Sequence, residues 1–127
     1  MKRITAQLDS LFQALGDRTR LRILNLLADG EVCVCFFVEV LGEPQPKISR
    51  HLGVLRAADL VTARRDGKWM HYRATTPMGL ESLLGSVMEA LRADPDMARD
   101  RVALAQACCS TRVPELLKRA PKPQIAG

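Results

Sequence analysis

The chain has 127 residues, of which 47% are hydrophobic and 26% charged, as is usual for a globular protein. This length allows one domain of roughly 100 residues with a tail and excludes two cores of normal size. No run of about 18 apolar residues is present, which argues against a membrane span, and the net charge of +5 favours a polyanionic partner.

The N-terminal residues predict a protein that stays in the cytoplasm. Lys2 and Arg3 are basic, but no apolar run follows them, so this end does not have the pattern of a secretory signal peptide. In a reducing cytosol the four cysteines are expected to be thiols, metal ligands or redox sensors rather than disulfides.

Two helices are predicted at the start of the chain. The first has four apolar residues at helical spacing, namely Leu8, Leu11, Phe12 and Leu15. Gly16 marks its C-terminus, because glycine commonly follows the last helical turn. Asp17 is a suitable N-cap for the second helix, which is expected to end near residues 29–30.

The segment 31–41 contains two conflicting signals. Its β-branched and aromatic residues favour a strand. Its position between two predicted helices favours a short buried helix instead, and this is the element that we expect.

A further helix is predicted to begin at Gln45, after the break at Pro44, with Pro46 at its first position. Three apolar residues at helical spacing should face the core: Ile48, Leu52 and Leu55. Residues 60–65 and 68–73 are then predicted as two strands joined by a type I′ turn at Asp66 and Gly67. This hairpin is the most specific local pattern in the chain.

The C-terminal part is predicted to contain two helices and a tail. Thr76 and Pro77 are typical of a helix start, and a broad apolar stripe from Met78 to Leu91 follows them. A weaker helix is expected over residues 97–108. We therefore predict one domain over residues 1–108 and a largely disordered tail over residues 109–127.

Three helices, a hairpin and a further long helix is the element order of a winged helix-turn-helix domain, a mainly α fold with a β-hairpin wing. Between Gly42 and Arg73 there are seven basic and three acidic residues, so this segment supplies +4 of the total charge of +5. Positive charge concentrated on the recognition helix and wing suits the neutralisation of DNA phosphates.

Three segments resemble the ArsR/SmtB family of metal-responsive repressors. They are residues 11–24 (LFQALGDRTRLRIL), residues 45–56 (QPKISRHLGVLR) and residues 64–73 (RRDGKWMHYR). The resemblance is close over residues 8–73 and loose over residues 77–91. It implies a homodimer paired through terminal helices, whose recognition helices enter successive major grooves of operator DNA about 34 Å apart.

Eight residues are candidates for DNA contact in this geometry. They are Gln45, Lys47, Ser49, Arg50 and His51 on the recognition helix and Arg64, Arg65 and Lys68 on the wing. Gln and Arg can read base edges, whereas Ser and Lys more often hold phosphate. A solvated polar face is the alternative for the helix, and a structural role between two helices is the alternative for His51.

Cys33 and Cys35 are predicted to bind a soft ion, because two thiols lie at i and i+2 in an apolar run. Residues 31–35 (EVCVC) also resemble the thiol box of the arsenic- and cadmium-sensing branches of the family. The resemblance implies As(III) or Sb(III), which take three sulfurs in a pyramidal arrangement. Side chains at i and i+2 of a regular helix point about 200° apart, so we expect binding to unwind the first helical turn and shift the recognition helix.

The third sulfur departs from the family pattern. The arsenic-sensing box places a third cysteine where this chain has Val38, and no cysteine precedes Cys33. The hypothesised third ligand is therefore Cys108 or Cys109, from either subunit. The alternatives are an incidental thiol pair or a separate C-terminal site without regulatory effect. The resemblance implies that a zinc sensor of this family would use Asp and His ligands along the last long helix. Zinc sensing is therefore disfavoured, because residues 77–107 contain no histidine.

These inferences predict a homodimeric repressor that binds As(III) or Sb(III) through thiolates, releases its operator and derepresses metalloid-resistance genes. One alternative is the same repressor responding to Cd(II), Pb(II) or thiol oxidation, and a distant one is a thiol metal carrier or oxidoreductase. An enzyme is not expected, because the Cys-X-Cys segment is not predicted to lie where a strand leads into a helix, the usual context of redox cysteines. No catalytic cofactor, membrane or further protein partner is expected.

Overall fold

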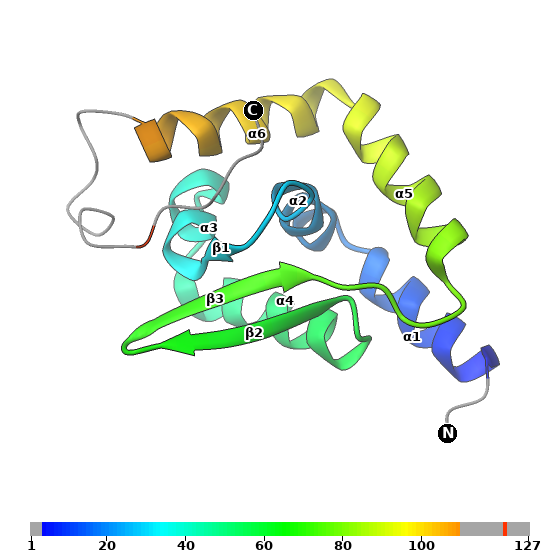
Figure 1. Cartoon of the computed structure of the whole chain (residues 1–127). Coiled ribbons are helices and arrows are strands. Elements are labelled where there is room, and N and C mark those ends of the chain that lie inside the picture. The colour runs from blue at the N-terminus through cyan, green and yellow to red at the C-terminus, as the bar shows by residue number, and fades with distance from the viewer. Residues whose placement is uncertain (1–3, 110–120, 122–127) are drawn as a thin grey trace.

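A computed structural model describes residues 4–109 and residue 121. Within these residues the chain forms six helices and three strands (Figure 1). In chain order they are α1 (Ile4–Leu15), α2 (Arg18–Leu26), β1 (Val32–Cys33), α3 (Val34–Leu41), α4 (Gln45–Ala57), β2 (Val61–Asp66), β3 (Trp69–Ala74), α5 (Glu81–Ala93) and α6 (Pro95–Cys109). None of the described helices combines the length and the apolar character needed to cross a membrane.

The described part of the chain is a helical body with a β-hairpin, which confirms the predicted fold class. Helices α2, α3 and α4 pack together, and α1 packs against α2 and α4. The strands form one antiparallel sheet in the order β1-β3-β2. The β2–β3 hairpin, which we call the wing, lies along the helical body. Its turn is at the end of the hairpin that is away from α1 and α5 (Figure 1).

One face of each central helix forms the core. The most deeply buried side chains include Leu11 of α1, Ile23 of α2, Phe36 and Phe37 of α3, and Ile48, Leu52 and Leu55 of α4. Burial of a large apolar side chain stabilises a fold by about 1.5–3 kcal/mol. These contacts therefore fix the rotation of α4 and direct its polar face to solvent.

The segment 31–41 satisfies both of its conflicting sequence patterns. Val32 and Cys33 form the short strand β1, and the predicted buried helix follows from Val34 onward as α3. Gly42 ends α3 with a φ of 66° and donates its N–H to the carbonyl oxygen of Val38 at 3.1 Å. This left-handed conformation favours glycine, because glycine has no Cβ.

The turn of the wing differs from its prediction by one residue. Asp66 pairs with Trp69, so the two turn residues are Gly67 and Lys68 rather than Asp66 and Gly67. Of these two residues only Gly67 has a positive φ, of 60°. Positive φ at the first central position alone is the type II′ pattern, so the predicted type I′ turn is wrong. The sequence Asp-Gly was misleading because Asp66 continues the strand.

The start of α5 also differs from its prediction. The helix begins at Glu81, so Thr76 does not cap it. Thr75 donates its N–H and its hydroxyl to carbonyl oxygens just before β2, which holds this segment against the sheet. Gly79 then has a φ of 88°, a conformation that interrupts a helix. Met78 is consequently 89% exposed instead of lying on the apolar stripe.

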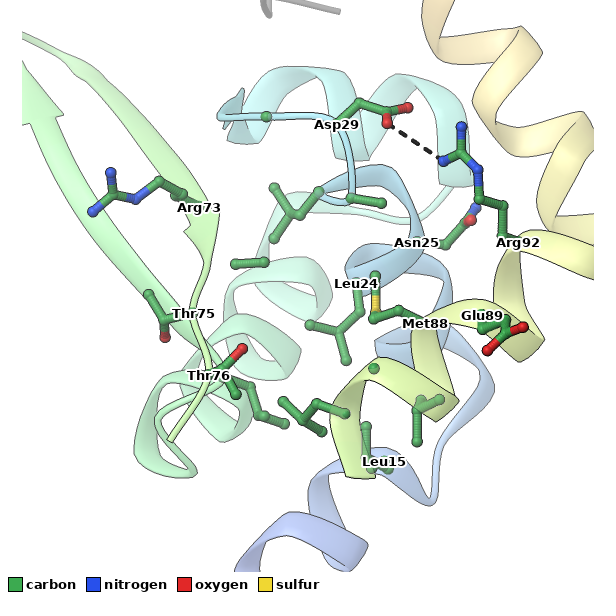
Figure 2. A pocket seen from close by; sticks show the side chains of 18 of the residues that line it. Leu15, Leu24, Asn25, Asp29, Arg73, Thr75, Thr76, Met88, Glu89 and Arg92 are labelled. Carbon is green, nitrogen blue, oxygen red and sulfur yellow. Dashed lines mark hydrogen bonds and ion pairs between the residues drawn. The ribbon is translucent and has the colours of Figure 1, made fainter. Parts of the chain in front are cut away.

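A groove of about 1000 Å³ lies between α2, α5 and the end of β3 (Figure 2). Its lining is largely apolar and includes Leu24 of α2 and Val87 and Met88 of α5. Asp29 and Arg92 form an ion pair across its edge, with an N···O distance of 3.4 Å. The face of α5 that lines this groove is thus incompletely covered by the rest of the described chain.

Helix α6 turns away from α5 and packs over α2 and α3 (Figure 1). The weaker helix predicted over residues 97–108 is confirmed, and it begins two residues earlier, at Pro95. Asp94 Oδ1 accepts two of its first backbone N–H groups, at 2.8 and 3.2 Å. Except for the end of α6 and one isolated residue, the predicted tail over residues 109–127 lies outside the described residues.

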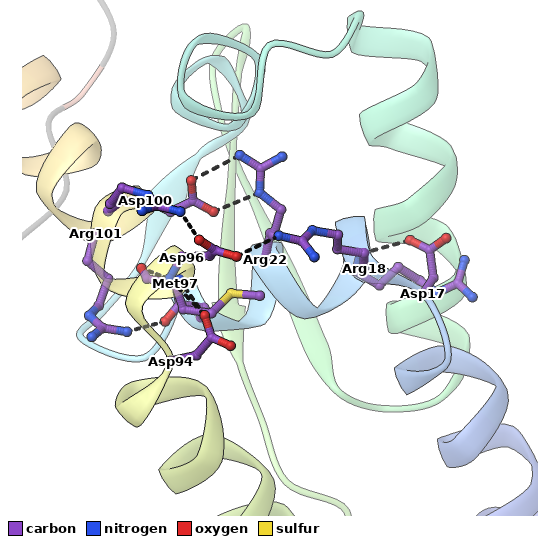
Figure 3. Close-up of polar contacts among 11 residues, drawn as sticks. Asp17, Arg18, Arg22, Asp94, Asp96, Met97, Asp100 and Arg101 are labelled. Atoms are coloured by element: carbon purple, nitrogen blue, oxygen red, sulfur yellow. Dashed lines mark hydrogen bonds and ion pairs between the residues drawn. The ribbon is translucent and has the colours of Figure 1, made fainter.

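Polar side chains fix α6 on α2 (Figure 3). Asp100 is 9% exposed and accepts two hydrogen bonds from Arg22, at 2.7 and 2.9 Å. Asn25, which is buried, donates to the carbonyl oxygen of Met97 at 2.9 Å and accepts from Arg101. Because a buried polar group that loses its partner destabilises the fold, these contacts determine where α6 lies.

Candidate DNA interface and thiol site

Helix α4 has an exposed polar face opposite its buried apolar face. Gln45, Ser49 and Arg50 are exposed, whereas Ile48 and Leu52 of the same helix are buried. The helix N-terminus follows Pro44 and has no side-chain cap, so its positive end is open to an anion. This surface has the shape and charge of a DNA-reading helix.

Two predicted DNA contacts on α4 are engaged within the protein. Lys47 is half-buried and pairs with Glu43 at 3.1 Å. The side chain of His51 is 15% exposed, and its Nδ1 lies 3.2 Å from Arg20 Nη1 and 3.7 Å from Asp17 Oδ2. His51 therefore occupies the seam between α4 and α2, the alternative position weighed for it, and its contact with DNA stays a prediction.

Arg20 joins three helices at this seam. Its Nε donates to the carbonyl oxygen of Ala14 at 2.7 Å and its Nη2 to that of Gln13 at 2.9 Å, at the end of α1. Asp17 caps α2 by accepting the backbone N–H of Arg20 at 3.1 Å. Burial acts to raise the pKa of Asp17, but this hydrogen bond and the charges of His51 and Arg20 outweigh it, so the pKa is lowered.

The three basic residues predicted on the wing have different surroundings. Arg65 and Lys68 are exposed, and Lys68 Nζ lies 5.1 Å from the centroid of the Trp69 ring, a cation–π contact. Arg64 instead donates to Glu31, with Nη2–Oε1 at 2.7 Å and Nε–Oε2 at 3.3 Å. Arg65 and Lys68 are therefore the wing residues available to DNA without breaking an ion pair.

Cys33 and Cys35 lie at the junction of β1 and α3. Cys33 is completely buried and is the extended N-cap residue, with φ −73° and ψ 143°. Cys35 lies in the first turn of α3 and is half-buried. Burial raises the pKa of the Cys35 thiol, and the adjacent Cys33 thiol raises it further. The expectation that both cysteines lie on a regular helix is wrong, because Cys33 belongs to a strand.

The position of Cys33 in a strand affects both the expected unwinding of a helical turn and the expected redox chemistry. No helical turn separates Cys33 from Cys35, so joining their sulfurs does not require a turn to unwind. The pair also lies at a strand-to-helix junction, contrary to the basis on which redox chemistry was set aside. Reactive redox cysteines have lowered pKa values, and the raised pKa of Cys35 still disfavours that chemistry.

Cys108 is buried on α6, which packs against α3. Val32 of β1 lines a cavity of about 280 Å³ together with Leu104 and Ala105 of α6. Cys108 is one helical turn beyond these two residues, so it lies on the side of α6 that is turned toward the β1–α3 segment.

The third ligand remains a prediction. Among the described side chains, those of residues 4–108 and residue 121, no three of His, Cys, Asp or Glu come together as a group that could hold a metal ion. The side chain of Cys109 lies outside the described residues. The described part of the structure thus brings Cys33 and Cys35 together without completing a group of three ligands.

Comparison with known proteins identifies the arrangement. Residues 17–63, from the cap of α2 to the start of the wing, match the sequence model of the family described as bacterial regulatory protein, arsR family. A probable mercury resistance operon repressor from Streptomyces lividans is 36% identical over 103 residues, 81% of this chain and 74% of that protein. The chain belongs to the ArsR family.

Other members of the ArsR family match shorter or more divergent stretches. The arsenical resistance operon repressor of Escherichia coli (strain K12) is 53% identical over 64 residues, half of this chain. The match spans 55% of that relative's own length. Among solved structures, HlyU from Vibrio cholerae N16961 has a TM-score of 0.62 and 26% identity, covering 71% of this chain and 97% of that one.

Sequence reasoning missed two polar residues of this ArsR-family chain. Arg20 lies inside the segment 11–24, and Glu31 begins the segment that resembles the thiol box. Their partners, His51 and Arg64, are 31 and 33 residues away in the chain. No local periodicity shows such pairs, although the sequence does show an acidic residue two positions before the first of the two cysteines.

Proposed function

We propose that this chain is a homodimeric repressor that releases its operator when As(III) or Sb(III) binds its cysteine thiolates, which allows metalloid-resistance genes to be expressed. The position of Cys33 and Cys35 carries the proposal. They lie at the junction of β1 and α3, and only Gly42 and two further residues connect the end of α3 to α4. The names of two relatives, which concern arsenical and mercury resistance, support a soft inducer.

DNA recognition is assigned to α4 and the wing. The exposed Gln45 and Arg50 have side chains that can form two hydrogen bonds with adenine and guanine edges, respectively. Ser49, Arg65 and Lys68 are exposed, and we assign them to phosphate contacts. In a dimer, two such surfaces would meet half-sites about 34 Å apart on one face of the duplex.

Dimerisation is assigned to α1 and α5. Ile4 and Phe12 of α1 are 53% and 56% exposed, although both are large apolar residues. Val87 and Met88 of α5 line the open groove (Figure 2). Contiguous apolar surface on a folded domain is typical of an interaction site, and a second copy of the chain would cover it.

Arsenite chemistry fits thiols of this kind. Each thiol that binds replaces one hydroxyl group of As(OH)₃, and its proton leaves with that hydroxyl as water. Binding to a protonated Cys35 therefore releases no net proton. The third sulfur is assigned to Cys108 or Cys109, from the same subunit or its partner, because α6 packs against α3.

Release of DNA follows from the recruitment of that third sulfur. Since the described residues hold no preformed site with three ligands, the bound ion must move α6 or the β1–α3 segment. Movement of α3 passes through Gly42 to α4 and its DNA-reading face. A coupling of about 1–3 kcal/mol for each site, summed over a dimer, suffices for derepression.

A DNA-release assay tests this function. Operator DNA is first selected from a random pool by rounds of binding, and its complex with the full chain is followed by fluorescence anisotropy. We expect arsenite and antimonite to release the DNA, and Cys33→Ser and Cys35→Ser to bind DNA normally but not to respond. Full release in both variants would remove the proposed site.

The same assay separates the alternatives. Release by cadmium, lead or peroxide but not by arsenite would support the same repressor with a different signal, which the mercury-named relative makes the main competitor. Failure to bind DNA at any salt concentration would support a thiol carrier. A double variant, Cys108→Ser with Cys109→Ser, tests the third ligand, because unchanged arsenite affinity would exclude both cysteines.

A further inference from the structure

We propose that Glu31 is a positioning residue that makes the wing respond to the thiol site, because it joins Arg64 and His71 of the wing to the segment that carries Cys33. This inference rests on the proposed function and adds a second connection to it. The path through α3 acts on the recognition helix, whereas the path through Glu31 acts on the β2–β3 hairpin.

The sheet aligns the residues concerned. Cys33 pairs with His71 across β1 and β3, and His71 pairs with Arg64 across β3 and β2. Residues paired in this way have their side chains on the same face of an antiparallel sheet. Glu31 is two residues before Cys33, so its side chain is directed to that same face. Glu31 Oε1 lies 3.7 Å from His71 Nδ1, which agrees with this geometry.

Glu31 holds the wing through polar contacts. It accepts two hydrogen bonds from Arg64, the shorter of 2.7 Å, and this ion pair, opposed by burial, lowers the pKa of the carboxyl group. His71 is 5% exposed, and its Nε2 has no hydrogen-bond partner among the described residues, with Asp66 Oδ2 at 3.9 Å. The wing is therefore attached to the thiol segment by charged groups around a buried ring.

An ion on Cys33 must disturb this attachment. Cys33 is completely buried, so space for an ion requires movement of the β1 backbone or of the side chain. Strand β1 contains only two residues, and a shift of its backbone carries Glu31 with it. The contact with Arg64 then lengthens, and the neighbouring DNA-facing residues Arg65 and Lys68 lose their fixed position.

The test uses the single tryptophan of the chain as a reporter. Trp69 begins β3 and is paired with Asp66 at the end of the wing, so its emission reports on the conformation of the wing. The full chain is titrated with phenylarsine oxide, which bridges two neighbouring thiols, and Trp69 emission and operator affinity are measured together. The variants are Glu31→Gln and the control Glu39→Gln, an identical change at an exposed position of α3.

We expect the unmodified chain and Glu39→Gln to change Trp69 emission and to lose operator affinity when the reagent binds. In Glu31→Gln the reagent should bind at least as tightly, because the contact that binding disturbs is already weakened. The emission change should be absent, and the loss of operator affinity should be about two- to fivefold smaller, the range for a partly exposed ion pair. Glu31→Asp, which keeps the charge, should restore part of the emission change.

An equal emission change and an equal loss of operator affinity in Glu31→Gln would overturn the inference. So would a loaded, unmodified chain whose Trp69 emission does not change. A purely structural role for Glu31 would lower the urea midpoint of Glu31→Gln and leave the reagent-induced emission change intact. Failure of the proposed function is a separate result, in which arsenite does not release DNA from the unmodified chain.

Discussion

Cys33 and Cys35 are two residues apart but have different access to solvent. Cys33 is completely buried at the end of β1, whereas Cys35 is half-buried in the first turn of α3. Under the proposed function, an incoming ion would therefore meet the Cys35 sulfur first and would reach Cys33 only after local movement. The reaction with Cys33 would then be the step that is coupled to DNA release.

The pKa of Cys35 makes its reactivity dependent on pH. Burial and the neighbouring Cys33 thiol raise this pKa above the ordinary value of 9.0, and the thiolate is the reactive form. Alkylation of Cys35 by iodoacetamide at about pH 7.5 should therefore be slower than that of free cysteine, and its rate should keep rising above pH 9. Peptide mass spectrometry measures the rate, and in Cys33→Ser the rate should increase.

Arg50 should affect DNA binding alone. It is exposed on α4 and lies on the opposite face from the buried residues that support α3. Arg50→Ala should weaken operator binding by about 1–3 kcal/mol if the side chain reads a base, with unchanged arsenite affinity of the free protein. Calorimetry with arsenite provides the control, and a weaker arsenite affinity would contradict the separation of the two surfaces.

At the level of elements, the sequence predicted helices better than their ends. The apolar spacing of Ile48, Leu52 and Leu55 was sufficient for α4, because periodicity reflects burial directly. The wing turn was misplaced by one residue, since Asp66 is compatible with both a strand and a turn. The start of α5 was misplaced because Thr76 and Pro77 resemble a cap, while the contacts of Thr75 with the loop before β2 are not local in sequence.

The sequence predicts which residues form the candidate site, an assignment that stays a prediction, but it does not predict how these residues are arranged. Cys33 and Cys35 were recognised from their spacing, whereas the strand residue Cys33 is fixed by its pairing with His71, 38 positions further along. The pairing of Arg64 with Glu31 also depends on the sheet register. Such contacts are set by tertiary packing, which overrides local propensity.

The attachment of α6 to α2 can be tested through Arg22. Arg22 makes both hydrogen bonds to the nearly buried Asp100, and this contact raises the pKa of the Arg22 guanidinium. Arg22→Ala leaves a buried carboxylate without its partner and should lower the free energy of unfolding by about 2–3 kcal/mol. Urea denaturation measures this loss.

A double variant provides the control for this prediction. Arg22→Met together with Asp100→Leu removes both charges and keeps apolar volume between α2 and α6, so it should regain most of the stability lost in Arg22→Ala. Equal stability of Arg22→Ala and the unmodified chain would show that α6 is held mainly by its apolar contacts.

At the scale of the whole molecule, three surfaces surround one core. The DNA-facing side of α4 and the wing, the thiol segment at β1–α3, and the apolar groove beside α5 are all supported by α2, α3 and α4. Helix α6 covers α2 and α3 of its own chain. Large apolar side chains are exposed on α1 (Ile4 and Phe12), on α4 (Val54) and on α6 (Val102), and the apolar groove borders α5. Under the proposed function, the signal, the DNA and the partner subunit would each bind to a different one of these surfaces.

The assignment of α1 to the dimer contact can be tested with two matched variants. Phe12 on α1 and Val102 on α6 are each 56% exposed, so replacing either by aspartate should leave the fold of the single chain intact. If α1 faces a second copy, Phe12→Asp buries an unpaired charge at the contact and should dissociate the dimer, whereas Val102→Asp should not. Sedimentation equilibrium measures the change.

Since a monomer engages only one half-site, operator affinity of Phe12→Asp should also fall by a factor of about 10²–10⁴. Dissociation by Val102→Asp alone would place the contact on α6 and would require a different orientation of the two recognition helices.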